Sequence, residues 1–186
     1  THENIKKGFW PKISGMLINN KAVGIIGFGN IGKKIANLTT KLGMRVFFYD
    51  IKKIKIPKNK FIKKTSKNFL LKNSDIIVMC CNLNKTSKNL IQMKELKLMK
   101  KNAGIINVAR GKIINENDLI KALKLNIINF AGLDVFEEEP LKKNNPLMTM
   151  KNCILSSHNA FNTLEQVKKV NENTLYNLLK GLKIKK

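Results

Sequence analysis

Three polar segments of the sequence carry residue types suited to proton transfer and to binding an anionic substrate. They are residues 107–111, which contain Arg110, residues 134–140, which contain three consecutive glutamates, and residues 156–160, which contain His158. A histidine can exchange a proton near neutral pH, and a neighbouring carboxylate can hold its ring in place. The planar guanidinium of an arginine can bind a carboxylate through two hydrogen bonds, which a lysine cannot do. Together these residues suit chemistry on a substrate that bears a carboxylate.

A glycine-rich motif earlier in the chain predicts a dinucleotide site. Gly27, Gly29 and Gly32 form a G-x-G-x-x-G sequence that follows a short β-branched run and opens a helical pattern. In this motif Gly27 makes the tight turn, Gly29 lets the backbone approach the pyrophosphate, and Gly32 lets helix and strand pack closely. The amides of Asn30 and Ile31 would face the phosphates at the positive end of the helix.

An acidic residue at the end of the next strand bears on which nucleotide is bound. Asp50 lies 18 positions after Gly32, where its carboxylate can accept hydrogen bonds from ribose hydroxyls and would repel a 2′-phosphate. This favours NAD over NADP as the cofactor. Lys52 and Lys53 keep the alternative open, because they could attract a 2′-phosphate if their loop folds back. A glycine turn that binds nothing is the other alternative.

Strands that alternate with helices must position these segments. Short apolar runs predict buried strands at residues 22–27, 45–49, 75–81, 104–108, 130–135 and 153–155. Helical patterns lie at residues 31–42, 67–72, 92–100, 115–125 and 164–179, and a lysine-rich loop with a short strand lies at 51–64. The alternation predicts an α/β fold, a Rossmann-type doubly wound parallel sheet flanked by helices. Such sheets bind ligands at the carboxyl ends of their strands, where the three polar segments lie.

The charge of the chain raises other function classes. The 36 Lys and Arg residues outnumber the 12 Asp and Glu residues, which gives a net charge of +24 and would suit a nucleic acid or an anionic membrane. Only Arg45 and Arg110 are arginine, however, whereas surfaces that read bases or clamp phosphates rely on arginine. No apolar run approaches the length of a membrane span. We therefore expect neither a nucleic-acid partner nor a membrane partner, and we interpret the lysines as compositional bias.

The cysteines favour a reducing environment. Cys80, Cys81 and Cys153 have neither the spacing of a metal site nor that of a disulfide framework. They are predicted to be buried thiols, so that a cytoplasmic protein without a metal is expected.

Four motifs in this order resemble the D-isomer-specific 2-hydroxyacid dehydrogenases. They are residues 23–32, residues 107–111, the G-L-D-V-F and E-P sequences within residues 132–140, and His158. The resemblance implies NAD-dependent interconversion of a D-2-hydroxy acid and its 2-oxo acid. It implies that Arg110 binds the substrate, that His158 is the acid/base, and that Glu139 is the partner of the histidine.

The resemblance also assigns further residues to the cofactor. Asp134 would support the nicotinamide end. The residues expected to line the cofactor are Asn82, Ser87, Val108 and Ala109. Glu139 is preferred among the three glutamates because it directly precedes Pro140, as the acid of the family does. The plain alternatives are a solvated acidic turn for the glutamates, a surface cation for Arg110 and a loop histidine for His158.

The same resemblance implies a domain organisation. Residues 1–12 would be a linker helix, residues 13–180 an NAD-binding Rossmann domain, and residues 181–186 the start of a return to a substrate-binding lobe that this sequence lacks. A homodimer is expected, with a small 2-hydroxy or 2-oxo acid as substrate. An NAD(H)-sensing protein that uses this fold without turnover is the alternative function, and nucleic-acid binding through the lysines ranks last.

Overall fold

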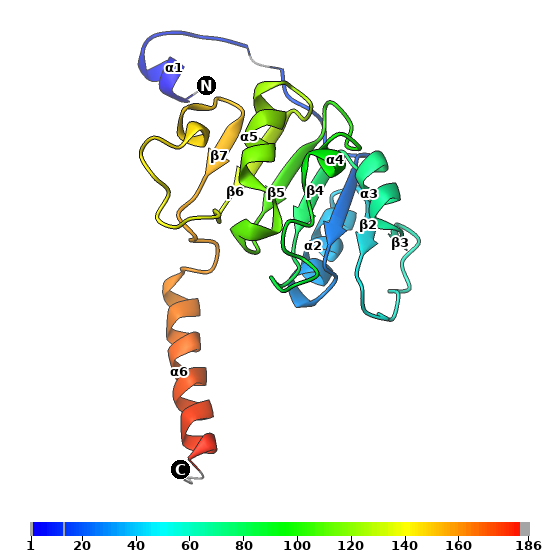
Figure 1. Cartoon of the computed structure of the whole chain (residues 1–186), viewed down its shortest axis with the longest axis vertical. Helices are drawn as coiled ribbons and strands as arrows, with labels where there is room; N and C mark the ends of the chain where they lie inside the picture. The colour runs from blue at the N-terminus through cyan, green and yellow to red at the C-terminus, as the bar shows by residue number, and fades with distance from the viewer. Residues whose placement is uncertain (1, 13, 183–186) are drawn as a thin grey trace.

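Seven parallel strands form one sheet in the order β3-β2-β1-β4-β5-β6-β7 (Figure 1). The computed structural model describes residues 2–12 and 14–182. The strands are β1 (Ala22–Ile26), β2 (Arg45–Tyr49), β3 (Ile62–Lys64), β4 (Ile76–Met79), β5 (Gly104–Asn107), β6 (Phe130–Leu133) and β7 (Cys153–Leu155). The strand order reverses between β1 and β4, which is the switch point where doubly wound sheets bind nucleotides. The predicted α/β fold and its strands are confirmed, with strand ends shifted by two residues or fewer.

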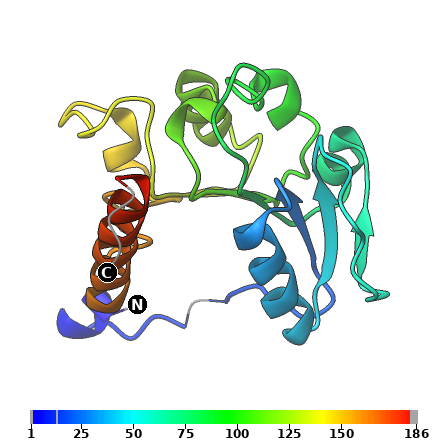
Figure 2. The same cartoon turned by 90° about the horizontal axis from the view of Figure 1, so that it is seen from below.

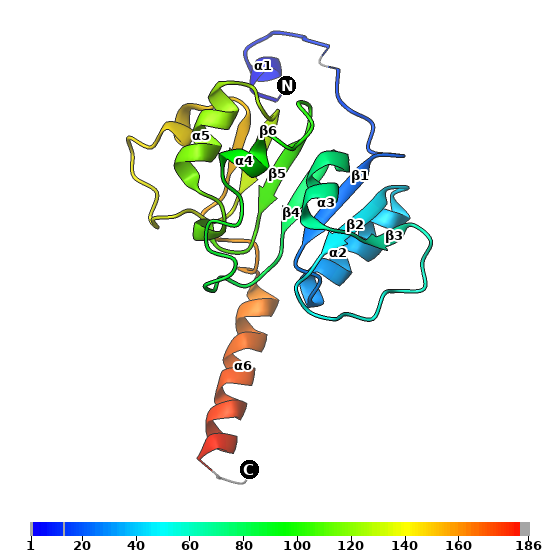
Figure 3. The same cartoon turned by 45° about the vertical axis from the view of Figure 1, so that its right-hand side comes forward.

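Helices cover the two faces of the sheet unequally (Figure 2). The helices are α1 (His2–Lys6), α2 (Asn30–Lys41), α3 (Lys67–Asn73), α4 (Met93–Leu96), α5 (Glu116–Lys124) and α6 (Leu164–Gly181), with 3₁₀ turns η1 (Gly111–Ile113) and η2 (Pro146–Thr149). Figure 3 shows α3, α4 and α5 in front of one face, whereas α2 lies against the other. Each face has its own apolar core. Leu70 and Ile105 belong to the core under α3–α5, and Ala36 and Phe48 belong to the core under α2.

The helix predicted at residues 164–179 forms but does not flank the sheet. It begins after Thr163, whose side chain caps it, and it extends away from the domain (Figures 1 and 3). None of its residues is buried, and Leu175, Tyr176 and Leu178 are more than half exposed. No helix in the described part of the chain is long and apolar enough to cross a membrane.

Three sequence predictions need correction. The helix expected at 92–100 ends at Leu96, because Leu98 and Met99 donate to carbonyls three residues earlier and tighten the chain into 3₁₀-like turns. The linker helix expected over 1–12 covers only His2–Lys6 and is followed by a turn at Gly8, where φ is +79°. Residues 183–186 of the expected return segment lie outside the described residues.

The third correction concerns the cysteines. Cys80, Cys81 and Cys153 are free thiols as predicted, but they are half-buried rather than buried. Cys80 and Cys81 pack toward opposite faces of the sheet, because successive residues of an extended chain alternate. Burial raises the pKa of Cys80 to about 12 and that of Cys153 to about 11, so both thiols stay protonated near neutral pH.

Asp75 joins the amino ends of three strands. Its carboxylate accepts hydrogen bonds from the Ala22 amide and from Lys100 Nζ, both at 2.8 Å. Its own amide donates to the Ala22 carbonyl, and its carbonyl accepts from the Gly104 amide. Burial would raise the pKa of this carboxyl, but the hydrogen bonds from Lys100 and Ala22 outweigh burial and lower the pKa below its usual value.

We predict that Asp75→Asn lowers the free energy of unfolding by about 1–2 kcal/mol at pH 7, because the charged hydrogen bonds are lost. Since the folded pKa is lowered, the stabilisation by Asp75 is present above the unfolded pKa and is lost as the pH falls through the folded pKa. The difference between wild type and variant should therefore be constant from pH 7 to about pH 5 and should shrink as the pH falls below about 4. Urea unfolding over this range measures it, with Lys101→Met as a control for a changed surface charge. A difference that does not vary with pH would contradict the assignment.

Candidate active site

Residues 27–32, which we name the glycine turn, bring β1, α2 and the end of β4 into close contact. Gly27 has φ of +95°, and a Cβ there would lie 2.5 Å from the Cys81 amide nitrogen. A Cβ at Gly32 would overlap the carbonyl oxygen of Gly27. Gly29, by contrast, has nothing within 4 Å of its Cβ position, so the space in front of the helix N-terminus is open to a ligand. The three glycines therefore have the geometry that a pyrophosphate site requires.

Asp50 holds the end of β2 against this turn. Its Oδ2 accepts a hydrogen bond from the Phe28 amide at 2.7 Å, and its Oδ1 accepts one from the Lys52 amide at 2.8 Å. A cavity of about 260 Å³ lies beside it. The predicted site residues that line this cavity are Gly27, Gly29, Asp50, Asn82 and Ser87. The carboxylate therefore stands at one end of a cavity that begins at the glycine turn.

The loop after β4 forms the opposite wall of this cavity. Ser87 is buried, and its hydroxyl donates to the Asn82 carbonyl at 2.6 Å and accepts from the Asn84 amide at 2.8 Å. Its hydroxyl is thus used within the loop, so that Ser87 shapes the wall through the backbone. Lys52, named from the sequence as a possible partner of a 2′-phosphate, also lines the cavity. Sequence reasoning missed other lining residues, among them Tyr49, Ile51, Asn84, Thr86 and Leu90. Their position directly after β2 and β4 was the available signal.

A second cavity, of about 500 Å³, continues along the same edge of the sheet. The predicted residues that line it are Ile31, Asn82, Val108, Ala109 and Arg110. Asn107 supports this wall, since its buried side chain donates to the Arg110 carbonyl at 3.0 Å and accepts from the Ala109 amide at 3.1 Å. A polar residue at the end of an apolar strand was the signal for Asn107, which sequence reasoning quoted but did not assign.

His158 and Glu139 form a hydrogen-bonded pair farther along this edge. His158 Nδ1 lies 2.8 Å from Glu139 Oε2, and Glu139 Oε1 accepts from the Phe136 amide at 3.0 Å. The hydrogen bond from His158 and the one from Phe136 lower the pKa of Glu139, and the nearby charge of Arg110 acts in the same direction. Glu139 therefore stays ionised beside the imidazole. The pair opens onto a largely apolar cavity of about 740 Å³ that Phe136 and Leu141 also line.

The histidine occupies an unusual backbone conformation that Asp134 supports. The φ of His158 is +56°, in the left-handed region that non-glycine residues avoid. Asp134 is buried at the end of β6, and its two carboxylate oxygens accept from the amides of Asn159 at 2.8 Å and Ala160 at 3.1 Å. Burial would raise the pKa of Asp134, but these hydrogen bonds and one involving Ser156 lower it. An ionised Asp134 thus fixes the turn that presents the imidazole.

The structure places the predicted residues along one edge of the sheet rather than in a single cavity. Asp134 and Val108 both line a further cavity of about 340 Å³, which lies between the cavity lined by Arg110 and the turn that holds His158. Asn30 begins α2 at the open side of the glycine turn, and Gly32 is buried behind it. The residues therefore suit an extended ligand at Gly29 and Asp50 and a reacting group near Arg110 and His158. Among the described residues, no group of three or more His, Cys, Asp or Glu side chains could hold a metal ion.

Comparison with known proteins places this arrangement in a family. Residues 1–160 match the family described as D-isomer specific 2-hydroxyacid dehydrogenase, NAD binding domain. A glyoxylate reductase of Aeropyrum pernix is 39% identical over 163 residues, which are 87% of this chain and 49% of that protein. A hydroxypyruvate reductase of Blautia hydrogenotrophica is 34% identical over 166 residues, 89% of this chain and 52% of that protein. The chain spans about half the length of the curated relatives it matches.

Solved structures agree in fold and in sequence. A glyoxylate reductase from Paecilomyes thermophila superimposes with a TM-score of 0.86 at 31% identity and covers 95% of this chain and 54% of its own. A D-lactate dehydrogenase from Aquifex aeolicus, complexed with NAD and lactic acid, has a TM-score of 0.88 at 26% identity and covers 98% and 60%. The chain belongs to the D-isomer-specific 2-hydroxyacid dehydrogenase family and forms its NAD-binding domain.

Proposed function

We propose that this domain serves the NAD-dependent interconversion of a D-2-hydroxy acid and its 2-oxo acid. The observation that carries the proposal is the His158–Glu139 pair, 2.8 Å apart, on the sheet edge that also carries the glycine turn and Arg110. Relatives that are glyoxylate and hydroxypyruvate reductases favour a small 2-oxo acid as the substrate class. The acid/base pair distinguishes this function from NAD(H) sensing without turnover, which has no use for it.

The proposed catalytic roles follow from the positions of the side chains. When bound, the cofactor would supply hydride chemistry at the substrate carbon, as a donor in the form of NADH and as an acceptor in the form of NAD⁺. Glu139 engages Nδ1 of His158, which leaves Nε2 as the ring nitrogen that can give a proton to the substrate oxygen during reduction or take it during oxidation. Because Glu139 remains ionised, it holds the Nδ1–H tautomer and favours the imidazolium while the proton is on the histidine. Arg110, exposed at the cavity wall, would bind the carboxylate of the substrate.

The proposed cofactor residues divide into backbone and side-chain contacts. The backbone at Gly27, Gly29, Asn30 and Ile31 would surround the pyrophosphate, while Gly32 keeps α2 close. Asp50 would bind the adenosine ribose. The residues proposed to line the bound cofactor are Asn82, Ser87, Val108 and Ala109. Asp134 would act at the nicotinamide end, since each of its oxygens can accept a second hydrogen bond beyond the amide it already has.

Turnover is proposed for a protein in which this domain is joined to a substrate-binding lobe. In this proposal residues 1–12 are the linker, residues 13–180 are the NAD-binding domain, and residues 181–186 lead back to the other lobe. Closure of two lobes would exclude water from the site and complete it. A homodimer is proposed on the same family resemblance.

We predict that Asp50→Asn weakens NADH binding about tenfold, because a charged acceptor for the ribose hydroxyls is lost. NADPH should bind as well as before or better, since the repulsion of its 2′-phosphate is removed. Calorimetric titration with both cofactors measures the ratio of their affinities. Glu165→Gln is the matched control, because Glu165 carries the same charge on the exposed helix α6. An unchanged ratio of NADH to NADPH affinity would show that Asp50 does not bind the ribose of the cofactor.

For the chemistry, we predict that His158→Ala lowers the kcat for 2-oxo acid reduction about 10²- to 10⁴-fold and leaves NADH affinity unchanged. Glu139→Gln should also lower kcat, because the imidazole loses its ionised partner. Glu138→Gln is the control, since Glu138 is exposed and pairs only with Lys142. The rate of NADH oxidation with glyoxylate, hydroxypyruvate and a panel of other 2-oxo acids measures these effects, in a protein that joins this domain to a substrate-binding lobe.

Two outcomes would redirect the assignment. Full activity of the His158→Ala enzyme would exclude this histidine as the acid/base. Tight NADH binding by a wild-type protein that contains both this domain and a substrate-binding lobe, but reduces no member of the panel, would favour the NAD(H)-sensing function instead.

A further inference from the structure

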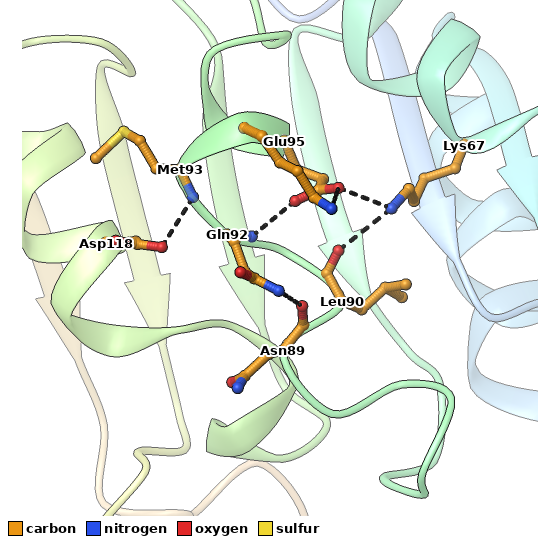
Figure 4. Close-up of polar contacts among 8 residues, drawn as sticks. Lys67, Asn89, Leu90, Gln92, Met93, Glu95 and Asp118 are labelled. Atoms are coloured by element: carbon orange, nitrogen blue, oxygen red, sulfur yellow. Dashed lines mark hydrogen bonds and ion pairs between the residues drawn. The ribbon is translucent and has the colours of Figure 1, made fainter.

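An ion pair between a buried glutamate and a half-buried lysine links two helices behind the nucleotide cavity. Glu95 of α4 is only 4% exposed, and its Oε1 lies 3.0 Å from Lys67 Nζ of α3 (Figure 4). The other carboxylate oxygen accepts a hydrogen bond from the Gln92 amide at 3.1 Å. Lys94 Nζ lies 3.9 Å from the first oxygen but is largely exposed, so it is a poor substitute for Lys67. Neither member of the pair lines a cavity of the site.

The same side chains fix the short segment before α4. Lys67 Nζ also donates to the Leu90 carbonyl at 3.5 Å, and the amide of Met93 donates to Asp118 Oδ2 at 2.9 Å (Figure 4). The side chain of Gln92 donates to the Asn89 carbonyl at 2.9 Å. Residues 89–93, which we name the hinge segment, are thus held by α3 from one side and by α5 from the other.

The hinge segment is continuous with one wall of the site and hydrogen-bonded to another. It directly follows the loop that lines the nucleotide cavity through Thr86 and Ser87, and Leu90 of the segment itself lines the same cavity. The amides of Asn89 and Ile91 donate to carbonyls of η1, the turn that follows Arg110, at 2.9 and 3.2 Å. A shift of the hinge segment therefore moves both the loop that lines the nucleotide cavity and the turn η1 that follows Arg110.

Intrinsic stability does not explain the position of this segment. The four-residue helix α4 is far too short to be stable alone, so its place depends on contacts with neighbours. A buried ion pair is often no more stabilising than an apolar pair of the same size, because desolvation offsets the attraction. Its directional hydrogen bonds, however, select one geometry. The pair is thus better suited to fixing a position than to adding stability.

We propose that Lys67 and Glu95 are positioning residues that set the hinge segment, and through it the affinity of the site for the nucleotide. Asp118 assists from α5 through the Met93 amide. This inference rests on the proposed function, because it takes the cavity between Asp50 and Ser87 as part of the NAD site. In this proposal, Lys67 and Glu95 act through the hinge segment and contact neither NAD nor substrate.

The test compares Lys67→Met and Glu95→Gln with Lys72→Met. Lys72 lies on the same helix, is exposed, and changes the net charge by the same amount as Lys67 when replaced by methionine. We expect the Kd for NADH to rise about three- to tenfold in Lys67→Met and Glu95→Gln and to stay within about twofold in Lys72→Met. Fluorescence titration with NADH gives Kd, and it is made well below the thermal midpoint of each variant, which is measured separately.

The two measurements separate positioning from stability. Folded Lys67→Met and Glu95→Gln proteins that bind NADH with the wild-type Kd, whatever their thermal midpoints, would overturn the inference. Failure of both variants to fold would show that the pair serves stability and would overturn it as well. A wild-type chain that is folded and does not bind NADH would instead contradict the nucleotide site itself.

Discussion

Hydrogen bonds from backbone amides to carboxylates hold this domain in its working shape. The chain has only 12 acidic residues, and most of them accept a hydrogen bond from a backbone amide in a loop, at a strand end or at the start of a helix. These residues are Asp50, Asp75, Glu95, Glu116, Asp118, Asp134, Glu137 and Glu139. An amide in a loop has no strand or helix partner, and a charged acceptor satisfies it more strongly than a neutral one. The scarce acids are therefore placed where the backbone lacks regular partners.

This arrangement matters most at the carboxyl edge of the sheet. Parallel strands end there in loops of different length, and the loops carry the residues of the site. Asp50 ties the end of β2 to the glycine turn, and Asp134 ties the end of β6 to the turn that holds His158. A histidine at φ of +56° has an energetic cost of order 1 kcal/mol, so its turn needs support from outside. The carboxylates thus fix the backbone of the loops that carry the side chains of the site.

The sequence predicted what depends on local pattern. The strand at residues 22–27, the glycines after it and Asp50 are close in the chain, and each has a distinctive composition. The choice of Glu139 among three glutamates came from family resemblance, and in the structure Glu139 is the one that reaches His158, whereas Glu137 exchanges hydrogen bonds with the backbone near Glu116.

Other features depend on contacts between distant segments and left no local signal. Lys67 and Glu95 are 28 residues apart and look like ordinary members of a charged chain, so neither was identified. The short α4 was overestimated for a similar reason, because its helical pattern continues in the sequence beyond the point where 3₁₀-like turns replace it. Helix α6 has an amphipathic pattern, but the pattern does not specify what covers the apolar side.

The distribution of charge also has a physical consequence for the site. Because 36 Lys and Arg residues face only 12 Asp and Glu residues, most lysines cannot have a carboxylate partner, and the domain keeps a strongly positive field. Between residues 4 and 74 the only acid is Asp50. A positive field alone would attract NADP, with its extra phosphate, more than NAD. Most lysines act through screened solvent, however. Lys52 also lines the nucleotide cavity but is exposed, whereas Asp50 is half-buried there and hydrogen-bonded to the Phe28 amide, so its charge is screened less. In the proposed function, the preference for NAD over NADP therefore rests on the short-range carboxylate of Asp50, which opposes the charge of the whole chain.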